Sequence, residues 1–188
     1  RTPMNAILGM AAVAEHNLDN RDKLKDCLLK IHTSGDHLLE LINAVLDMSK
    51  IESGKLSLRY EPFDFAELLS ELTELLKPQA DAGRLTMEVS LTKLKNEKVI
   101  GDPLRVQQVC INILSNAIKY TPAGGSIHVT VTQKAGARKG YLNYVFCCSD
   151  TGIGMKEEFI ERLFQPFERA QDSTSSKVTG TGLGMAIT

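Results

Sequence analysis

The sequence NILSNAIKY at residues 112–120 lies near the end of a helix predicted over residues 103–120. Asn112, Asn116 and Lys119 are separated by four and three residues, so all three lie on one face of that helix. Two amides and an ammonium group on one face can bind a magnesium ion and meet phosphate oxygens. The simpler alternative is an ordinary solvated face of a surface helix.

Two glycine-containing motifs follow in the sequence. DTGIGM at residues 150–155 comes directly after a predicted strand, and its Asp150 can accept a hydrogen bond from an exocyclic amine such as that of adenine. Taken alone, this motif also fits an ordinary turn between a strand and a helix. GTGLGM at residues 180–185 opens a helix and suits phosphate bound to backbone N–H groups. It lacks the lysine of a Walker loop and the spacing of a dinucleotide-binding motif.

A third motif, LFQPF at residues 163–167, places two aromatic side chains before a polar stretch at residues 171–176. The composition of the polar stretch predicts a mobile loop. Apolar residues at the base of such a loop are what a nucleotide lid needs in order to open and close. The alternative is that the aromatic residues make an ordinary core contact.

Around these motifs the sequence predicts a mixture of strands and helices. The expected strands are residues 55–60, 85–91, 98–101, 126–133 and 141–149, and the expected helices are residues 64–82 and 103–120. The second helix starts at Pro103 with Asp102 as its N-cap, and residues 134–140 join the last two strands as a hairpin. This pattern predicts an α+β sandwich with helices on one face of a sheet.

The first part of the chain has a different pattern. Apolar residues recur at steps of three and four over residues 22–49, which predicts one long helix with a heptad seam. A shorter helical pattern covers residues 4–16, and a polar turn at residues 17–20 separates the two. We expect an antiparallel helical hairpin that dimerises into a four-helix bundle and stops at Ser53-Gly54. The seam consists of Leu24, Leu28, Ile31, Leu38, Ile42 and Val45, with Cys27, Leu41 and Met48 on a second stripe. The expected domains are residues 1–54 and 55–188.

Composition excludes some partners and predicts a location. The 188 residues are 43% hydrophobic, which allows a substantial core, and 22 basic against 23 acidic residues give a net charge of -1. That balance gives no reason to expect a nucleic acid or an acidic membrane surface as a partner. Four cysteines, Cys27, Cys110, Cys147 and Cys148, show no metal-ligand or disulfide pattern, and we interpret them as buried thiols in a reducing compartment. Without a long apolar run or a signal peptide, the chain is expected to be cytoplasmic.

The order of these motifs resembles that of the sensor histidine kinases of two-component signalling. RTPMN at residues 1–5, followed by residues 112–120, 150–155, 164–167 and 180–184, resembles the H, N, G1, F and G2 boxes of that family. The resemblance covers nearly the whole chain. It implies a dimerisation and histidine phosphotransfer hairpin joined to a Bergerat-type (GHKL) ATP-binding sandwich, which DNA gyrase, Hsp90 and MutL share.

By position, the resemblance implies a site for ATP and Mg²⁺. Asn116 would hold the magnesium ion, and Asn112 and Lys119 would lie close to the phosphates. Tyr120 would lie beside the nucleotide.

The same resemblance assigns the glycine motifs. Asp150 would bind the adenine amine, and Gly152 and Gly154 would shape that pocket. The residues of the lid that closes over the phosphates would be Gly180, Gly182, Leu183 and Gly184.

One departure from the family concerns the phospho-accepting histidine. In the family it lies three residues before the position of Arg1 and is followed at once by a glutamate, and neither residue is in this chain. We therefore assign no catalytic residue here, since His16, His32, His37 and His128 lack the sequence that should follow it. Thr2 matches the position implicated in dephosphorylating the response regulator. The ATP-binding domain is also expected to be truncated at its C-terminus.

The resemblance implies that the intact protein phosphorylates itself on histidine with ATP and passes the phosphate to an aspartate of a response regulator receiver domain. It would act as a homodimer, as the cytoplasmic portion of a parent that can be anchored in a membrane. This fragment would bind nucleotide only. Two alternatives remain open, an ATPase of the gyrase or Hsp90 class and a non-catalytic dimeric scaffold that binds nucleotide.

Overall fold

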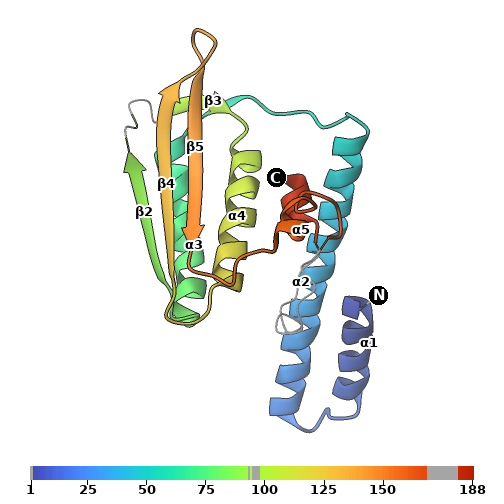
Figure 1. The fold of residues 1–188 in the computed structure, drawn as a ribbon. Helices are drawn as coiled ribbons and strands as arrows, with labels where there is room; N and C mark the ends of the chain where they lie inside the picture. Colours follow the sequence, from blue (N-terminus) through green and yellow to red (C-terminus); the bar gives the residue numbers. More distant parts are fainter. Residues whose placement is uncertain (1, 93, 95–97, 169–181) are drawn as a thin grey trace. The chain divides into compact units, whose positions relative to one another are not determined.

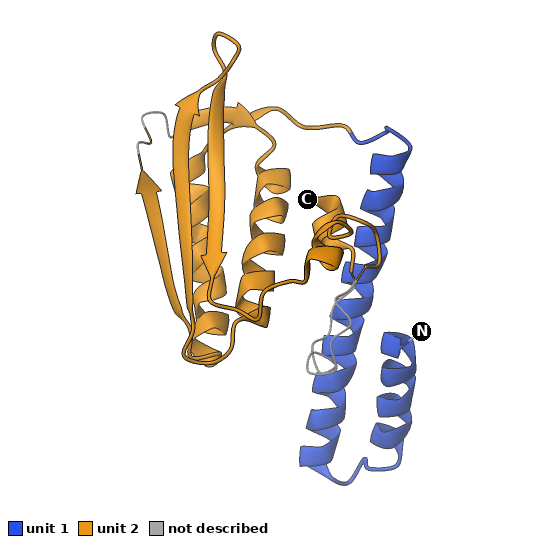
Figure 2. Cartoon of the chain, in the orientation of Figure 1, with its two compact units in different colours: residues 1–56 blue, residues 57–188 orange. Residues whose placement is uncertain are grey.

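The computed structural model describes residues 2–92, 94, 98–168 and 182–188. It divides into two compact units, residues 1–56 and residues 57–188 (Figure 2). The first unit is helical, and the second contains both strands and helices (Figure 1). The predicted α+β class with an N-terminal helical hairpin is therefore confirmed.

The first unit is an antiparallel pair of helices, α1 (Thr2–Glu15) and α2 (Arg21–Glu52) (Figure 1). The side chain of Asn20 caps the start of α2 by accepting a hydrogen bond from the backbone N–H of Lys23 at 3.1 Å. Gly54, with a φ of 64°, follows the C-cap of α2, a left-handed conformation that glycine adopts without steric cost. These signals make α2 start and stop close to where the sequence predicts.

The hairpin has more apolar surface than its own two helices cover. Ala14 and Cys27 are buried between the helices. Other apolar side chains of the two helices and their connecting turn remain exposed in a single chain, namely Met4, Leu8, Val13, Leu18, Leu28, Leu29, Leu39, Ile42, Val45 and Leu46. Three of these belong to the predicted heptad seam, so that seam is only partly covered by α1.

The described residues of the second unit form two sheets. The larger one has the strand order β2-β4-β5, formed by Thr86–Thr92, Ser126–Ala135 and Leu142–Asp150. β2 runs parallel to β4, and β4 runs antiparallel to β5. A smaller antiparallel pair is formed by β1 (Glu61–Asp64) and β3 (Lys98–Gly101).

Two helices, α3 (Phe65–Ala82) and α4 (Pro103–Tyr120), cover one face of the larger sheet, as predicted (Figure 1). Leu114 of α4 packs in a buried cluster with Ile127 and Val129 of β4. This packing fixes α4 against the sheet by one face and leaves its opposite face available. Two short helices, α5 (Glu157–Ile160) and α6 (Gly184–Ile187), also lie in the described part of this unit.

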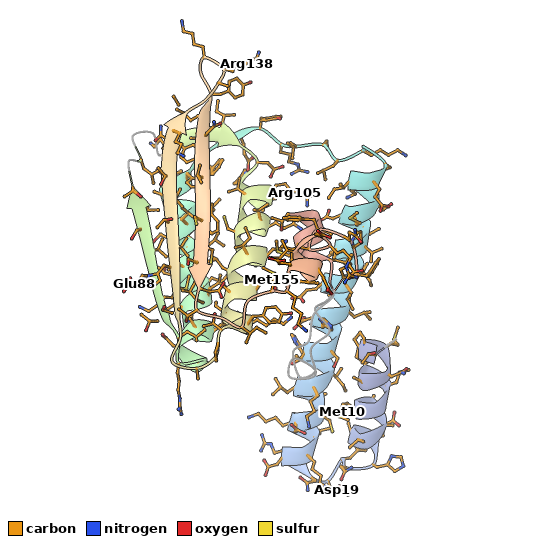
Figure 3. The ribbon with its side chains drawn as sticks, in the orientation of Figure 1. Met10, Asp19, Glu88, Arg105, Arg138 and Met155 are labelled. Atoms are coloured by element: carbon orange, nitrogen blue, oxygen red, sulfur yellow. The ribbon has the colours of Figure 1, made fainter. Side chains whose placement is uncertain are left out.

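The other face of the sheet is polar. Glu88 on β2 is labelled in Figure 3, and its Oε2 atom lies 3.1 Å from Nδ1 of His128 on β4. Cys147 pairs in register with Thr130 on β4 and is exposed. The prediction that all four cysteines are buried is therefore wrong for Cys147, because alternate residues of a strand point to opposite faces.

The strand predicted at residues 55–60 is also wrong. Strand β1 begins at Glu61, and the backbone N–H of Arg59 donates to Asp102 Oδ2 at 3.0 Å instead of to a sheet partner. The other carboxylate oxygen of Asp102 accepts the N–H of Arg105 at 3.1 Å, as expected of the N-cap of α4. Asp102 thus ties the segment before β1 to the start of α4.

Asp102 should make stability depend on pH. Chiefly because the Arg59 N–H binds its carboxylate, the pKa of Asp102 lies below its ordinary value of 3.8. The stabilisation from Asp102 is therefore complete above the ordinary pKa and is lost as the pH falls through the lower folded-state pKa. Asp102→Ala should lower the urea midpoint more at pH 7 than at acid pH, because the carboxylate becomes protonated as the pH falls.

The control is Asp81→Ala, which removes an exposed carboxylate near the end of α3. Urea unfolding followed by circular dichroism at both pH values measures the difference. An equal loss of midpoint for Asp102→Ala at the two pH values would contradict this role of the ionised carboxylate.

None of the described helices combines the length and the apolar character that a membrane span requires.

Candidate functional site

The predicted phosphate-side residues lie on the second half of α4. Asn112, Asn116, Lys119 and Tyr120 are all half-buried, while Leu114 on the same helix is buried against the sheet. The Asn116 side chain has no hydrogen-bond partner among the described residues. The helix therefore presents an uncommitted amide on the face that does not pack on the sheet.

The ammonium group of Lys119 lies over the ring of Tyr120, with 5.0 Å between Nζ and the ring centroid. This cation–π contact holds both side chains at the end of α4. Asn112, Asn116 and Lys119, which were predicted from their spacing, thus lie on one helix together with Tyr120.

The DTGIGM motif begins at the last residue of β5. The Oδ1 atom of Asp150 accepts the backbone N–H of Gly152 at 2.8 Å, which closes a small turn through its own side chain. Its second oxygen, Oδ2, has no partner among the described residues, and the residue is exposed. One carboxylate oxygen is therefore available to accept a hydrogen bond from a ligand.

This turn packs directly against the end of α4. The backbone N–H of Ile153 donates to the carbonyl oxygen of Tyr120 at 3.2 Å. A Cβ at Gly152 would lie 2.5 Å from Asp150 Oδ1 and 2.8 Å from Tyr120 O, so no side chain fits there. The structure thus joins the 150–155 motif to the 112–120 motif.

The second glycine motif contacts α4 at Asn112, which is closer to the N-terminus of the helix than Tyr120. Asn112 Nδ2 donates to the carbonyl oxygen of Gly184 at 2.8 Å, and a Cβ at Gly184 would lie 3.4 Å from Asn112 Oδ1. Leu183 beside it is completely buried. The amide that the resemblance places close to the phosphates is here bound to the backbone of α6. Gly180 lies outside the described residues.

The two aromatic residues of the LFQPF motif are not ordinary core residues. The side chain of Phe164 is 62% exposed and that of Phe167 is 65% exposed. The motif is instead held through its backbone, since Phe167 N–H donates to Gly182 O at 2.9 Å. Gly182 has a φ of 70°, and a Cβ there would lie 2.8 Å from the Phe167 carbonyl carbon. The predicted mobile loop at residues 171–176 lies outside the described residues.

The other described residues of the predicted site are Gly154 and Thr2. Gly154 has a φ of 69°, which favours glycine, but no atom lies within 4 Å of the position of its Cβ. Thr2 is exposed at the start of α1.

Sequence reasoning missed a set of residues around the exit of β5. Thr151 and Thr121 each lie close to Gly125 there, since a Cβ at Gly125 would lie 2.4 Å from Thr121 Cγ2 and 2.8 Å from Thr151 Oγ1. No spacing rule in the sequence links Thr151 to Thr121 or to Gly125.

Cys148 lies two residues before Asp150 and packs on the core. Burial, with a smaller contribution from the Asp150 carboxylate, raises the pKa of Cys148 to about 11. The thiol is therefore neutral at physiological pH, and it contributes an apolar surface rather than a nucleophile.

The chemistry of the site suits a ligand that carries an amine at one end and anionic oxygens at the other. Asp150 offers an acceptor, while Asn116 and Lys119 offer an amide and a cation. No group of three or more histidine, cysteine, aspartate or glutamate residues in the described part of the chain could hold a metal ion by itself.

Two family models match the chain. Residues 1–54 match the His Kinase A (phospho-acceptor) domain. Residues 101–188 match the histidine kinase-, DNA gyrase B- and HSP90-like ATPase.

Known proteins similar to this chain agree with these models. The non-motile and phage-resistance protein of Caulobacter vibrioides is 38% identical over 193 residues, which cover 100% of this chain and 22% of that protein. The circadian input-output histidine kinase CikA of Synechococcus elongatus is 37% identical over 194 residues, covering 100% of this chain and 24% of CikA. This chain thus spans about a quarter or less of the length of these relatives.

A solved structure, that of full-length ShkA in complex with AMPPNP, matches with a TM-score of 0.73 and 29% identity, over 100% of this chain and 37% of that one. Fold, motif order and both family models agree. The chain belongs to the sensor histidine kinase family. It carries the phospho-acceptor domain followed by the ATPase domain.

Proposed function

We propose that this chain binds ATP together with Mg²⁺ between the second half of α4, the 150–154 turn and the 182–184 segment. The observation that carries this proposal is the direct packing of the 150–154 turn on the end of α4. A hydrogen bond from Ile153 to Tyr120 and the close approach of Gly152 hold these two segments together. An acceptor for the adenine amine is thereby fixed next to a helix face that carries phosphate-binding groups.

Asp150 accepts the adenine amine through Oδ2, because Oδ1 is already bound to the N–H of Gly152. Lys119 neutralises phosphate oxygens, and its contact with Tyr120 holds the ammonium group at the end of α4. These residues bind and orient the nucleotide, which is most of what a phosphoryl-transfer site has to do.

Magnesium fits this donor set. Mg²⁺ keeps several waters and usually takes one or two protein oxygens together with substrate phosphates. Asn116 has an amide that no described residue engages, and it lies on the same face of α4 as Lys119. The ion would supply charge neutralisation of the phosphates when bound, and Asn116 would hold its position.

For the whole protein we propose autophosphorylation on histidine followed by transfer to an aspartate of a response regulator, with Thr2 assisting dephosphorylation. The match of residues 1–54 to the phospho-acceptor domain supports this role. The exposed apolar faces of α1 and α2 support a homodimer, in which a second hairpin covers them and completes a four-helix bundle.

The test is Asp150→Asn, measured in the full-length protein by ADP titration and by the incorporation of acid-labile phosphate from γ-labelled ATP. A hydrogen bond to a charged group contributes about 1.5–3 kcal/mol, so ADP affinity should fall by roughly tenfold to a hundredfold. Phosphate incorporation at sub-saturating ATP should fall with it.

Asp19→Asn is the matched control, since Asp19 lies exposed in the turn between α1 and α2 (Figure 3). Unchanged ADP affinity in Asp150→Asn would contradict the site. Acid-stable phosphate in the unchanged protein, or steady hydrolysis without any incorporation, would instead indicate an ATPase of the gyrase or Hsp90 class.

A further inference from the structure

We propose that Thr151 is a positioning residue whose hydroxyl group sets the selectivity of this site for adenine, by fixing the point at which β5 leaves the sheet. The proposal rests on the nucleotide-binding function and adds to it a residue that acts through Asp150. Three observations support it, namely the hydrogen bonds of Thr151, the close approach of Thr151 and Thr121 to Gly125 and the position of Asp150 between two fixed neighbours.

The first observation is that one backbone hydrogen bond at the end of the β4–β5 pair is replaced by a hydrogen bond to a side chain. Ile127 pairs with Asp150 in register, so Ser126 and Thr151 face each other one position further on. Facing residues at a hydrogen-bonded position of an antiparallel ladder normally exchange two backbone hydrogen bonds. Here Thr151 N–H donates to Ser126 O at 3.1 Å, but Ser126 N–H donates to Thr151 Oγ1 at 2.9 Å.

The hydroxyl group thus takes the place of the Thr151 carbonyl oxygen. The backbone can leave the sheet directly after Thr151 without losing the hydrogen bond of Ser126 N–H. Residues 152 and 153 then reach the end of α4, where Ile153 N–H binds Tyr120 O.

The second observation is the close approach of Thr151 and Thr121 to Gly125. A Cβ at Gly125 would lie 2.8 Å from Thr151 Oγ1 and 2.4 Å from Thr121 Cγ2. Thr121 is only 7% exposed, and its hydroxyl donates to Ala117 O of α4 at 2.7 Å. Thr151 therefore lies close to a glycine that also approaches Thr121, and two residues later the Ile153 N–H binds Tyr120 O of α4.

The third observation concerns Asp150 itself. Asp150 is the last residue of β5 and pairs in register with Ile127 of β4. Directly after it, the chain makes a turn in which the carboxylate of Asp150 accepts the N–H of Gly152. Thr151 lies between these two constraints and determines the angle at which the carboxylate meets a base. Loss of the hydroxyl group should therefore weaken recognition of the adenine amine, with little effect on the phosphate-binding residues of α4.

The test compares ADP with inosine diphosphate, whose base carries an oxygen where adenine carries its amine. Thr151→Val keeps the shape of the side chain and removes the acceptor, whereas Thr151→Ser keeps the acceptor. The ratio of the two affinities should fall by about fivefold to tenfold in Thr151→Val, the worth of one hydrogen bond. Thr151→Ser should restore the ratio of the unchanged protein.

The outcomes separate the two proposals. If the unchanged protein does not bind ADP, the proposed function fails. If it binds ADP and Thr151→Val keeps the full preference over inosine diphosphate, or lowers both affinities equally, the function stands and the positioning role is refuted. Amide exchange at Ser126 in the unchanged protein gives a check that needs no variant, since a freely exchanging Ser126 N–H would also refute the proposal.

Discussion

Gly152→Ala should reduce ADP affinity by more than about a hundredfold, a larger loss than the removal of one charged hydrogen bond. The reason is steric, because the new Cβ would lie 2.5 Å from Asp150 Oδ1 and 2.8 Å from Tyr120 O. The neighbouring Tyr120 carbonyl is backbone and cannot rotate away. The Asp150 carboxylate must therefore turn, or the 150–154 turn must separate from α4, and either change disrupts the proposed adenine pocket.

Gly124→Ala is the control for this prediction. Gly124 has a φ of 87°, and no atom lies within 4 Å of the position of its Cβ, so alanine there introduces backbone strain without a collision. It should lower the stability of the second unit slightly and leave ADP affinity within about twofold. Isothermal titration measures both variants, and equal losses of affinity would show that backbone strain, not the collision, decides the effect.

Leu114→Ala should destabilise the second unit by about 3 kcal/mol. Leu114 is 2% exposed and packs with Ile127 and Val129 of β4, so its loss leaves a cavity beneath the helix that carries the proposed phosphate-binding face. ADP should still bind the folded fraction, because Asn116 and Lys119 lie on the opposite face of α4.

Leu104→Ala provides a matched control on the same helix. Leu104 is 64% exposed, so the same truncation should change the unfolding free energy by less than about 0.5 kcal/mol. Urea unfolding of both variants, with and without saturating ADP, measures the difference. A loss below about 1 kcal/mol for Leu114→Ala would contradict the assigned core.

Elements with local signals were predicted well. Helix α4 spans residues 103–120 as expected, because Asp102 and Pro103 mark its start within the sequence itself. The strand predicted at residues 55–60 failed for the opposite reason. The hydrogen-bond partner of Arg59 is Asp102, 43 residues further along the chain, and no local pattern could indicate that the N–H binds a carboxylate rather than a strand.

The same contrast applies to the candidate site. Residue types and their order indicated which segments belong together, and the structure places residues 112–120 against both the 150–155 turn and the 182–184 segment. The role of each residue toward a ligand stays a prediction. Thr151 was missed because its importance lies in a side-chain hydrogen bond to Ser126, 25 residues earlier, which leaves no periodic trace in the sequence.

The hydrogen bond from Asn112 to Gly184 links two events that would otherwise be independent. The Asn112 amide is a proposed neighbour of the phosphates, and in this structure it donates to the first residue of α6. A nucleotide that draws this amide toward its phosphates competes with the docking of α6 on α4. By thermodynamic reciprocity, the factor by which bound nucleotide loosens α6 equals the factor by which a docked α6 weakens nucleotide binding.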